Sequence, residues 1–240
     1  MNLPTGKIYL IPTPLSDDNI SSFVIPYNYE IIKKLRIFVV EELRTARRFL
    51  RKISPDFPID DCQFFILNEH TIKTINFNEI LKETINGNDI GLMSEAGLPC
   101  IADPGSELVA AAHTKNLTVI PLVGASSIFM ALMASGLCGQ KFAFHGYLPT
   151  DKIELIASIR KLEQQSRIEQ QTQIFMETPY RNMQLLEILL KHCCTDTLLC
   201  ITCNINGKEE YIKTKTIAQW KKYTLPQLHK KPTIFAITLR

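Results

Sequence analysis

Short apolar runs alternate with longer amphipathic segments through the first half of the chain. The apolar runs cover residues 7–11, 36–40, 63–67 and 118–123, with a further run that ends at Met93. The segments between and after them, at residues 41–52, 74–85, 107 onward and 126–135, have helical character. Runs without polar alternation, such as residues 119–123, are typical of strands covered on both faces. The alternation predicts a parallel β-sheet with helices on both faces.

The second half shows a less regular order of strands and helices. Strands are predicted at residues 142–146, 173–176, 198–203, 209–214 and 233–238, and helices at residues 151–171, 182–194 and 217–223. Two of these strands follow each other directly, with Asn206-Gly207 between them as a hairpin-type turn. A mixed, partly antiparallel sheet is expected. The chain is therefore predicted to form two α/β domains, at residues 1–122 and 123–240.

Composition and charge narrow the class of protein. Of 240 residues, 45% are hydrophobic and 21% are charged, as in ordinary globular proteins, and the formal net charge is +3. No apolar run is long enough to cross a membrane, and the N-terminus lacks a signal-peptide pattern. Seven cysteines, an odd number, disfavour a secreted disulfide framework. We expect a cytoplasmic protein that does not contact a membrane.

Several common chemical motifs are absent from the sequence. No GxGxxG follows the first strand, and neither GxxxxGK[ST] nor GxSxG occurs, which disfavours common nucleotide-binding and serine-hydrolase sites. Cys200 and Cys203 have metal-like spacing, but they lie in a predicted strand, where residues three apart point to opposite faces. They are interpreted as buried small residues, and no metal site is predicted.

Four arginines lie on one face of the predicted helix at residues 41–52, where the acidic residues come first and the basic residues later. The arginines are Arg44, Arg47, Arg48 and Arg51. This order suits the helix dipole. The row is either an ordinary solvated face or a surface for a phosphate backbone.

The most informative stretch is residues 91–109. A strand ends at Met93, small-residue turns follow at residues 94–99 and 103–106, and an Ala-rich helix begins at Glu107. Turns between a strand and a helix expose backbone N–H groups that a ligand can use. On spacing alone, the stretch is either such a site or a plain connection.

Six motifs in this order resemble the tetrapyrrole methylase superfamily, the class III S-adenosylmethionine (SAM)-dependent methyltransferases. Within it they resemble the ribosomal RNA small subunit methyltransferase I subfamily, which 2′-O-methylates a cytidine. The matching segments are Thr13-Pro14-Leu15-Ser16-Asp17, Glu41-Glu42-Leu43-Arg44, Ser94-Glu95-Ala96-Gly97-Leu98-Pro99 with Ala102-Asp103-Pro104-Gly105, Val123-Gly124-Ala125-Ser126-Ser127, Gly146-Tyr147-Leu148-Pro149, and Glu177-Thr178-Pro179-Tyr180-Arg181.

The resemblance implies two α/β domains of tetrapyrrole methylase type, a SAM cleft between them, and a homodimer. By motif position, the residues implied to contact SAM are Pro14, Ser94, Glu95, Ala96, Gly97, Ile101, Ser126, Ser127 and Met176. Main-chain groups at small-residue turns can hold the adenosine and the methionine tail, and a helix start at Ser126 and Ser127 suits a carboxylate. Glu42 and Glu95 are the candidate general bases. Arg44 and Arg181 are candidates to position an anionic substrate.

The chain departs from the subfamily pattern in its outer loops. The glycine of T-P-I-G is Ser16, the threonine of E-D-T-R is Leu43, and the histidine of E-S-P-H-R is Tyr180. The R-E-L-T-K region reads Ile201-Thr202-Cys203-Asn204-Ile205 and lacks both a cation and an acid. Methylation of RNA, with the small ribosomal subunit as partner, is the first expectation. A methyltransferase of a tetrapyrrole or other small molecule, and a SAM-binding module without catalysis, are the alternatives.

Overall fold

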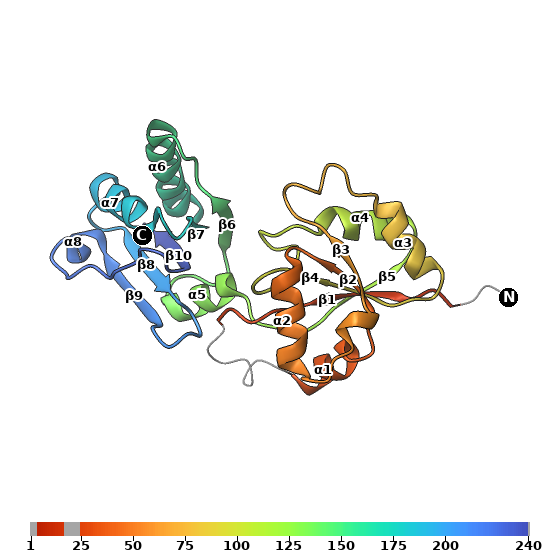
Figure 1. Cartoon of the computed structure of the whole chain (residues 1–240). Helices are drawn as coiled ribbons and strands as arrows, with labels where there is room; N and C mark the ends of the chain where they lie inside the picture. The colour runs from red at the N-terminus through yellow and green to blue at the C-terminus, as the bar shows by residue number, and fades with distance from the viewer. Residues whose placement is uncertain (1–3, 17–24, 240) are drawn as a thin grey trace. The chain divides into compact units, whose positions relative to one another are not determined.

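The computed structural model describes residues 4–16 and 25–239. The chain divides into two compact units, Met1–Ser126 and Ser127–Arg240, and each contains one sheet (Figure 1). The boundary predicted from the sequence lies after residue 122. The predicted α/β class, with a parallel first sheet and a mixed second sheet, is confirmed.

The N-terminal unit contains a five-stranded, fully parallel sheet in the order β3-β2-β4-β1-β5. Its strands are β1 (Lys7–Ile11), β2 (Ile37–Val40), β3 (Gln63–Ile66), β4 (Ile90–Met93) and β5 (Thr118–Pro121). All residues of β2 and β4 are buried, as their continuous apolar runs predict. The same prediction is wrong for residues 119–123, because β5 is an edge strand that ends at Pro121, and Val123 is 70% exposed.

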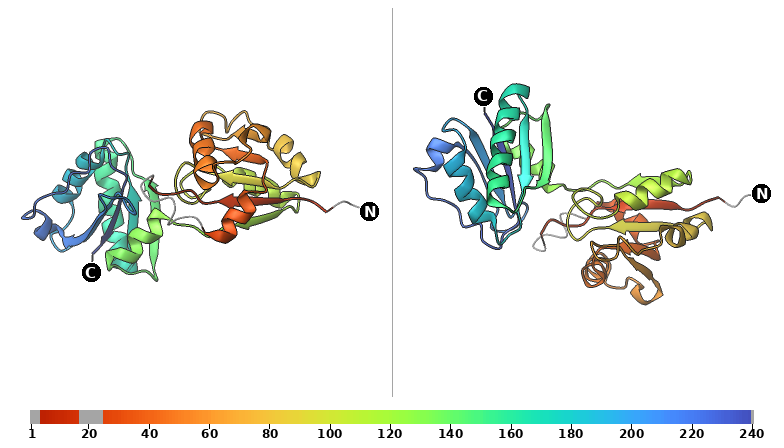
Figure 2. Two further views of the ribbon diagram at one scale, coloured as in Figure 1. Left: turned by 60° about the horizontal axis from the view of Figure 1, so that its bottom comes forward. Right: turned by 90° about the horizontal axis from the view of Figure 1, so that it is seen from above.

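Two pairs of helices cover this sheet on opposite faces (Figures 1 and 2). Helices α1 (Pro26–Ile32) and α2 (Leu43–Ile53) pack with Phe38 and Val40. Helices α3 (Phe77–Ile85) and α4 (Ser106–Thr114) pack on the other face with Val39 and Leu92. A 3-10 turn, η2 (Ile59–Asp61), packs beside α2. Adjacent strand residues point to opposite faces, so one short strand supplies both cores.

Two helix starts differ from the sequence prediction by two or more residues. Helix α2 begins at Leu43, because Glu42 has extended backbone geometry and its carboxylate accepts the N–H of Arg44 as an N-cap. The predicted acidic first turn is therefore wrong: the first turn holds no acid, and it contains Arg44. Helix α3 begins at Phe77, where Asn76 is the cap, and not at residue 74. At both starts, a hydrogen bond from a backbone N–H to the capping side chain outweighs the helix propensity of the preceding residues.

The C-terminal unit contains a mixed five-stranded sheet in the order β6-β7-β10-β8-β9. Its strands are β6 (Phe142–Tyr147), β7 (Thr172–Met176), β8 (Leu198–Cys203), β9 (Tyr211–Thr216) and β10 (Thr233–Thr238), of which only the pair β6 and β7 is parallel. Helices α6 (Lys152–Glu169), α7 (Asn182–His192) and α8 (Ile217–Trp220) pack on one core. Helix α5 (Ser127–Ser135) packs on the core of the other face.

Strand β8 confirms the interpretation of its two cysteines. Cys200 packs in the core beneath α5, whereas Cys203 packs in the opposite core. The hairpin that follows is longer than predicted: Cys203 pairs with Tyr211, so residues 204–210 form the connection. Asn204 and Asn206 adopt positive φ angles of 49° and 63°, and Gly207 does not. The predicted connection was residues 204–208, and Asn206-Gly207 does not form the predicted hairpin-type turn within it.

Candidate functional site

The N-terminal sheet changes its winding direction at β1 and β4. Helix α1 follows β1 on one face of the sheet, whereas helix α4 follows the neighbouring strand β4 on the other. From the carboxyl ends of these two strands, the chain therefore continues to helices on opposite faces of the sheet. Open parallel sheets bind ligands at such a switch point.

A cavity of about 200 Å³ lies at this switch point. It is lined by residues from the loops after β1 and β4 and from α2: Thr13, Pro14, Leu15, Ser16, Thr45, Ala46, Arg48, Phe49, Lys52, Ser94, Glu95 and Ala96. Four residues predicted from sequence motifs 80 positions apart meet here, namely Pro14, Ser94, Glu95 and Ala96. Asp17, the last residue of the first motif, lies outside the described residues.

Gly97 joins the two loops through its backbone. Its N–H donates to the carbonyl of Thr13 (N···O 3.0 Å), and the N–H of Thr13 donates to the carbonyl of Gly97 (N···O 2.8 Å). The Thr13 hydroxyl also lies 3.3 Å from the carbonyl oxygen of Ser94, and Thr13 is buried. Because Gly97 has a φ of 83°, this pairing uses a conformation that suits glycine. The bridge holds the two cavity walls in register.

The loop after β4 contains four residues with positive φ. Two are glycines, Gly97 and Gly105, and two carry side chains, Cys100 (φ 68°) and Ala102 (φ 64°). Non-glycine residues in this region cost on the order of 1–3 kcal/mol each, and such strain gathers at ligand sites. The loop is thus built at a cost in stability that a plain strand-to-helix connection does not require.

Acidic side chains gather at the carboxyl ends of β2 and β4. The backbone N–H of Glu95 lies 3.4 Å from a carboxylate oxygen of Glu41. Burial raises the pKa of Glu41, and the negative charges of Asp103 and Glu95 raise it further. Burial also raises the pKa of Asp103, with an added contribution from Glu95. The carboxylates of Glu41, Glu95 and Asp103 therefore repel one another at this end of the sheet, and a cationic group close to them would relieve that repulsion.

The partly buried acid Asp103 predicts how stability depends on pH. A carboxyl whose pKa is raised on folding costs stability when ionised, so stability should increase as pH falls from neutral toward the ordinary Asp value of 3.8. Asp103→Asn should therefore melt higher than wild type at pH 8, and the difference should shrink toward pH 4. Differential scanning fluorimetry across this range tests it, with the exposed Asp56→Asn as control. An equal shift at both pH values would contradict the expectation.

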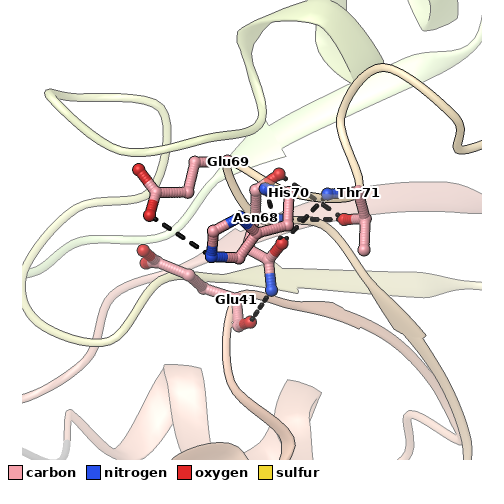
Figure 3. Close-up of polar contacts among 5 residues, drawn as sticks. All are labelled: Glu41, Asn68, Glu69, His70 and Thr71. Carbon is pink, nitrogen blue, oxygen red and sulfur yellow. Dashed lines mark hydrogen bonds and ion pairs between the residues drawn. The ribbon is translucent and has the colours of Figure 1, made fainter.

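A polar network fixes the end of β3 against the end of β2 (Figure 3). The Asn68 side-chain oxygen accepts the N–H groups of His70 and Thr71, at 3.0 and 3.1 Å, and its amide nitrogen donates to the carbonyl of Glu41 at 3.3 Å. The ring of His70 lies 3.4 Å from the Glu69 carboxylate, and both side chains are exposed. This network is an Asx-type turn that positions the Glu41 backbone.

The two candidate bases have different surroundings. Glu42 accepts the N–H of Arg44 at 2.7 Å, which is a helix-capping role, and it does not line the cavity. Glu95 lines the cavity, and its carboxylate accepts the hydroxyl of Thr45 at 3.1 Å. Thr45 and Lys52 lie outside the sequence motifs, and Thr13 lies in a matching segment but was not predicted as a contact. Leu43 replaces the family's threonine, and Thr45 lies two positions after it. The sequence therefore already contained a threonine hydroxyl close to the position where the family has one.

The other predicted residues are not among those that line this cavity. Ile101 follows the turn and is 44% exposed, and Ser126 is buried at the end of the N-terminal unit. In the C-terminal unit, Ser127 begins α5, and Met176, the last residue of β7, packs against the α5 core. Arg181 caps α7 and lies 3.3 Å from the buried carboxylate of Glu177.

Within residues 4–16 and 25–239, no group of three or more His, Cys, Asp or Glu side chains is arranged to hold a metal ion. Over the same residues, no helix has the length and apolar character needed to cross a membrane.

The chain is similar to several known proteins, although no protein-family profile matches it. It is 29% identical to the ribosomal RNA small subunit methyltransferase I of Buchnera aphidicola subsp. Acyrthosiphon pisum, over 90% of this chain and 73% of that protein. It is 31% identical to the protein of the same name from Halalkalibacterium halodurans, over 77% of this chain and 60% of that protein. The chain thus spans between 60% and 73% of the length of these two relatives.

A solved structure supports the fold. The crystal structure of the methyltransferase CobJ aligns with a TM-score of 0.63 over 98% of this chain and 94% of that chain, at 14% identity. At this identity the likeness concerns the fold alone.

Proposed function

The chain is a divergent relative of the ribosomal RNA small subunit methyltransferase I family within the tetrapyrrole methylase superfamily, and on that premise we propose that it is a SAM-dependent methyltransferase that acts on RNA. The observation that carries the proposal is the cavity at the switch point, where Pro14, Ser94, Glu95 and Ala96 meet. The names of the relatives point to small-subunit ribosomal RNA as the substrate, and the motif resemblance implies a ribose 2′-hydroxyl as the acceptor.

The residues at this cavity fit SAM on two grounds. The sulfonium and the amino group of SAM are cationic, and the raised pKa of both Glu41 and Asp103 marks a place where added positive charge relieves repulsion. The bridged turn at Gly97 keeps a Cβ out of the loop and leaves small residues beside the cavity. Pro14 and residues 94–97 would hold SAM from the N-terminal unit, and Ile101, Ser126, Ser127 and Met176 are further proposed contacts.

The chain's own residues would align the acceptor and remove its proton. Bound SAM supplies an electrophilic methyl group. A hydroxyl acceptor loses a proton as it is methylated, so a carboxylate within hydrogen-bond reach assists. Glu95 suits this role better than Glu42, because Glu95 lines the cavity and Glu42 caps α2. Arg44 and Arg181 are proposed to position the anionic substrate, although Arg181 also pairs with Glu177.

A small-molecule acceptor such as a tetrapyrrole is the second candidate, and a SAM-binding module without catalysis is the third. The cationic surface of α2 beside the cavity favours RNA over both. A cytoplasmic homodimer, as the family resemblance implies, completes the proposal.

Two measurements on the purified chain test this proposal. Calorimetry should show SAM binding at micromolar concentration, and transfer of a labelled methyl group to small ribosomal subunits should give a 2′-O-methylnucleoside by mass spectrometry. Absence of SAM binding would reject the family-based function as a whole. SAM binding without labelled RNA would favour the second or third candidate.

A further inference from the structure

Helix α2 carries five cations and no anion. Its sequence, LRTARRFLRKI, contains Arg44, Arg47, Arg48, Arg51 and Lys52. Ala46, Phe49 and Leu50 form the buried face. Four of the cations are exposed, and Arg47 is partly exposed and pairs with Asp60 at 2.9 Å. The net charge of the whole chain is only +3, whereas this helix alone carries five positive charges and no negative one.

This charge distribution costs stability. Like charges four positions apart repel, as at Arg44 and Arg48, Arg47 and Arg51, or Arg48 and Lys52. Arg44 also lies in the first turn, where the helix dipole disfavours a cation. Glu42 caps the helix through one hydrogen bond, yet no acid within the helix offsets the row. Packing against the sheet accounts for the apolar face of α2, but it does not require arginines on the exposed face.

The cations are contiguous with the candidate site. All five line a shallow surface hollow of about 410 Å³. Arg48 and Lys52 line both this hollow and the cavity at the switch point. A polyanion that lies along α2 would therefore end beside Glu95 and the Gly97 turn. The cavity itself contains Glu95 together with Arg48 and Lys52, so the row of cations begins in the site and continues along α2.

We propose that the exposed face of α2, defined by Arg44, Arg47, Arg48, Arg51 and Lys52, binds the phosphate backbone of the RNA substrate and directs the target nucleotide to the cavity. The proposal rests on the proposed RNA methyltransferase function and adds where the RNA lies. Arginine forks match phosphate geometry, and such contacts position a nucleic acid without reading its sequence. The expected binding is sequence-tolerant and strongly dependent on salt.

The test compares two matched double variants with wild type. Arg44→Gln/Arg51→Gln removes two exposed arginines seven residues apart on the α2 face, and Lys82→Gln/Lys115→Gln removes two exposed lysines of the α3 and α4 side. Binding of labelled small-subunit ribosomal RNA is measured by fluorescence anisotropy between 50 and 200 mM KCl, alongside calorimetry with SAM and thermal melting.

The arginine variant should bind RNA roughly 10-fold more weakly, with a log–log salt slope lower by about 2, since each lost phosphate contact lowers it by about 1. Its melting temperature should stay level or rise because like-charge repulsion is relieved, and its SAM affinity should not change. The lysine variant should bind RNA within twofold of wild type. If wild type methylates RNA and the arginine variant keeps its RNA affinity and salt slope, this inference is wrong while the proposed function stands.

Discussion

Gly97→Val should reduce SAM affinity by roughly 100-fold or more while both units stay folded. Valine at a φ of 83° is strained by on the order of 1–3 kcal/mol, because a β-branched side chain clashes with its own backbone there. The new Cβ would lie 3.2 Å from the Leu15 side chain, in the loop that lines the cavity. In the variant, either the pair of backbone hydrogen bonds between residue 97 and Thr13 is distorted, or the valine side chain occupies the space of the turn. Calorimetry with SAM measures the effect.

Gly136→Val is the matched control for the backbone strain. Gly136 has a φ of 70°, ends α5 in the C-terminal unit, and has no atom within 4 Å of a new Cβ. It should therefore lower the melting temperature by a similar amount and leave SAM affinity unchanged. Circular dichroism of both variants checks the fold. Wild-type SAM affinity in Gly97→Val would mean that the cofactor does not rest on this turn.

The sheet was the most predictable part of the molecule. Buried strands such as β2 and β4 are read directly from apolar runs, because both faces of a parallel sheet are covered. The start of α2 was not predictable from propensity. Glu41 and Glu42 are good helix formers. Even so, the helix begins after them, because the Glu42 carboxylate accepts a hydrogen bond from the Arg44 N–H and caps it. Strand β5 was misjudged because its position at the sheet edge depends on topology, which periodicity does not contain.

The turns of the candidate site were predictable from the sequence, whereas the hydrogen-bond partners of its side chains were not. Motif order placed Pro14 and residues 94–97 together, since parallel strands bring their carboxyl ends to one edge. The contact between Glu95 and Glu41 spans 54 residues and exists because β2 and β4 are neighbours in the sheet. The hydroxyl that donates a hydrogen bond to the Glu95 carboxylate belongs to Thr45, on the helix after β2. No local pattern specifies such partners, because they depend on strand order and helix rotation.

The two charge clusters assign different tasks to neighbouring surfaces. Carboxylates gather at the carboxyl ends of β2 and β4, and cations gather along α2, of which Arg48 and Lys52 also line the cavity. The helix contains five cations and no acid of its own, and Arg47 pairs with Asp60 outside it. A row of cations that adjoins the cavity suits a polyanionic acceptor better than a small molecule.

Glu95→Gln should lower the rate of methyl transfer by about 10²–10⁴-fold if Glu95 accepts the proton of the acceptor hydroxyl. Glutamine has nearly the same size and can still accept the hydrogen bond of Thr45, so the loop should keep its shape. SAM affinity should change by less than about 10-fold. Single-turnover transfer to small ribosomal subunits, with SAM binding measured separately, distinguishes loss of chemistry from loss of the cofactor.

Glu42→Gln is the comparison that separates catalysis from capping. Its amide oxygen can still accept the N–H of Arg44, so α2 should lose only a fraction of the ~1 kcal/mol that a helix cap contributes. The transfer rate should remain within about threefold of wild type, because Glu42 does not line the cavity. The reverse pattern, a large loss in Glu42→Gln with an unchanged rate in Glu95→Gln, would move the proton acceptor from the β4 loop to the start of α2. An unchanged rate in both would show that the acceptor hydroxyl loses its proton to water or to another group.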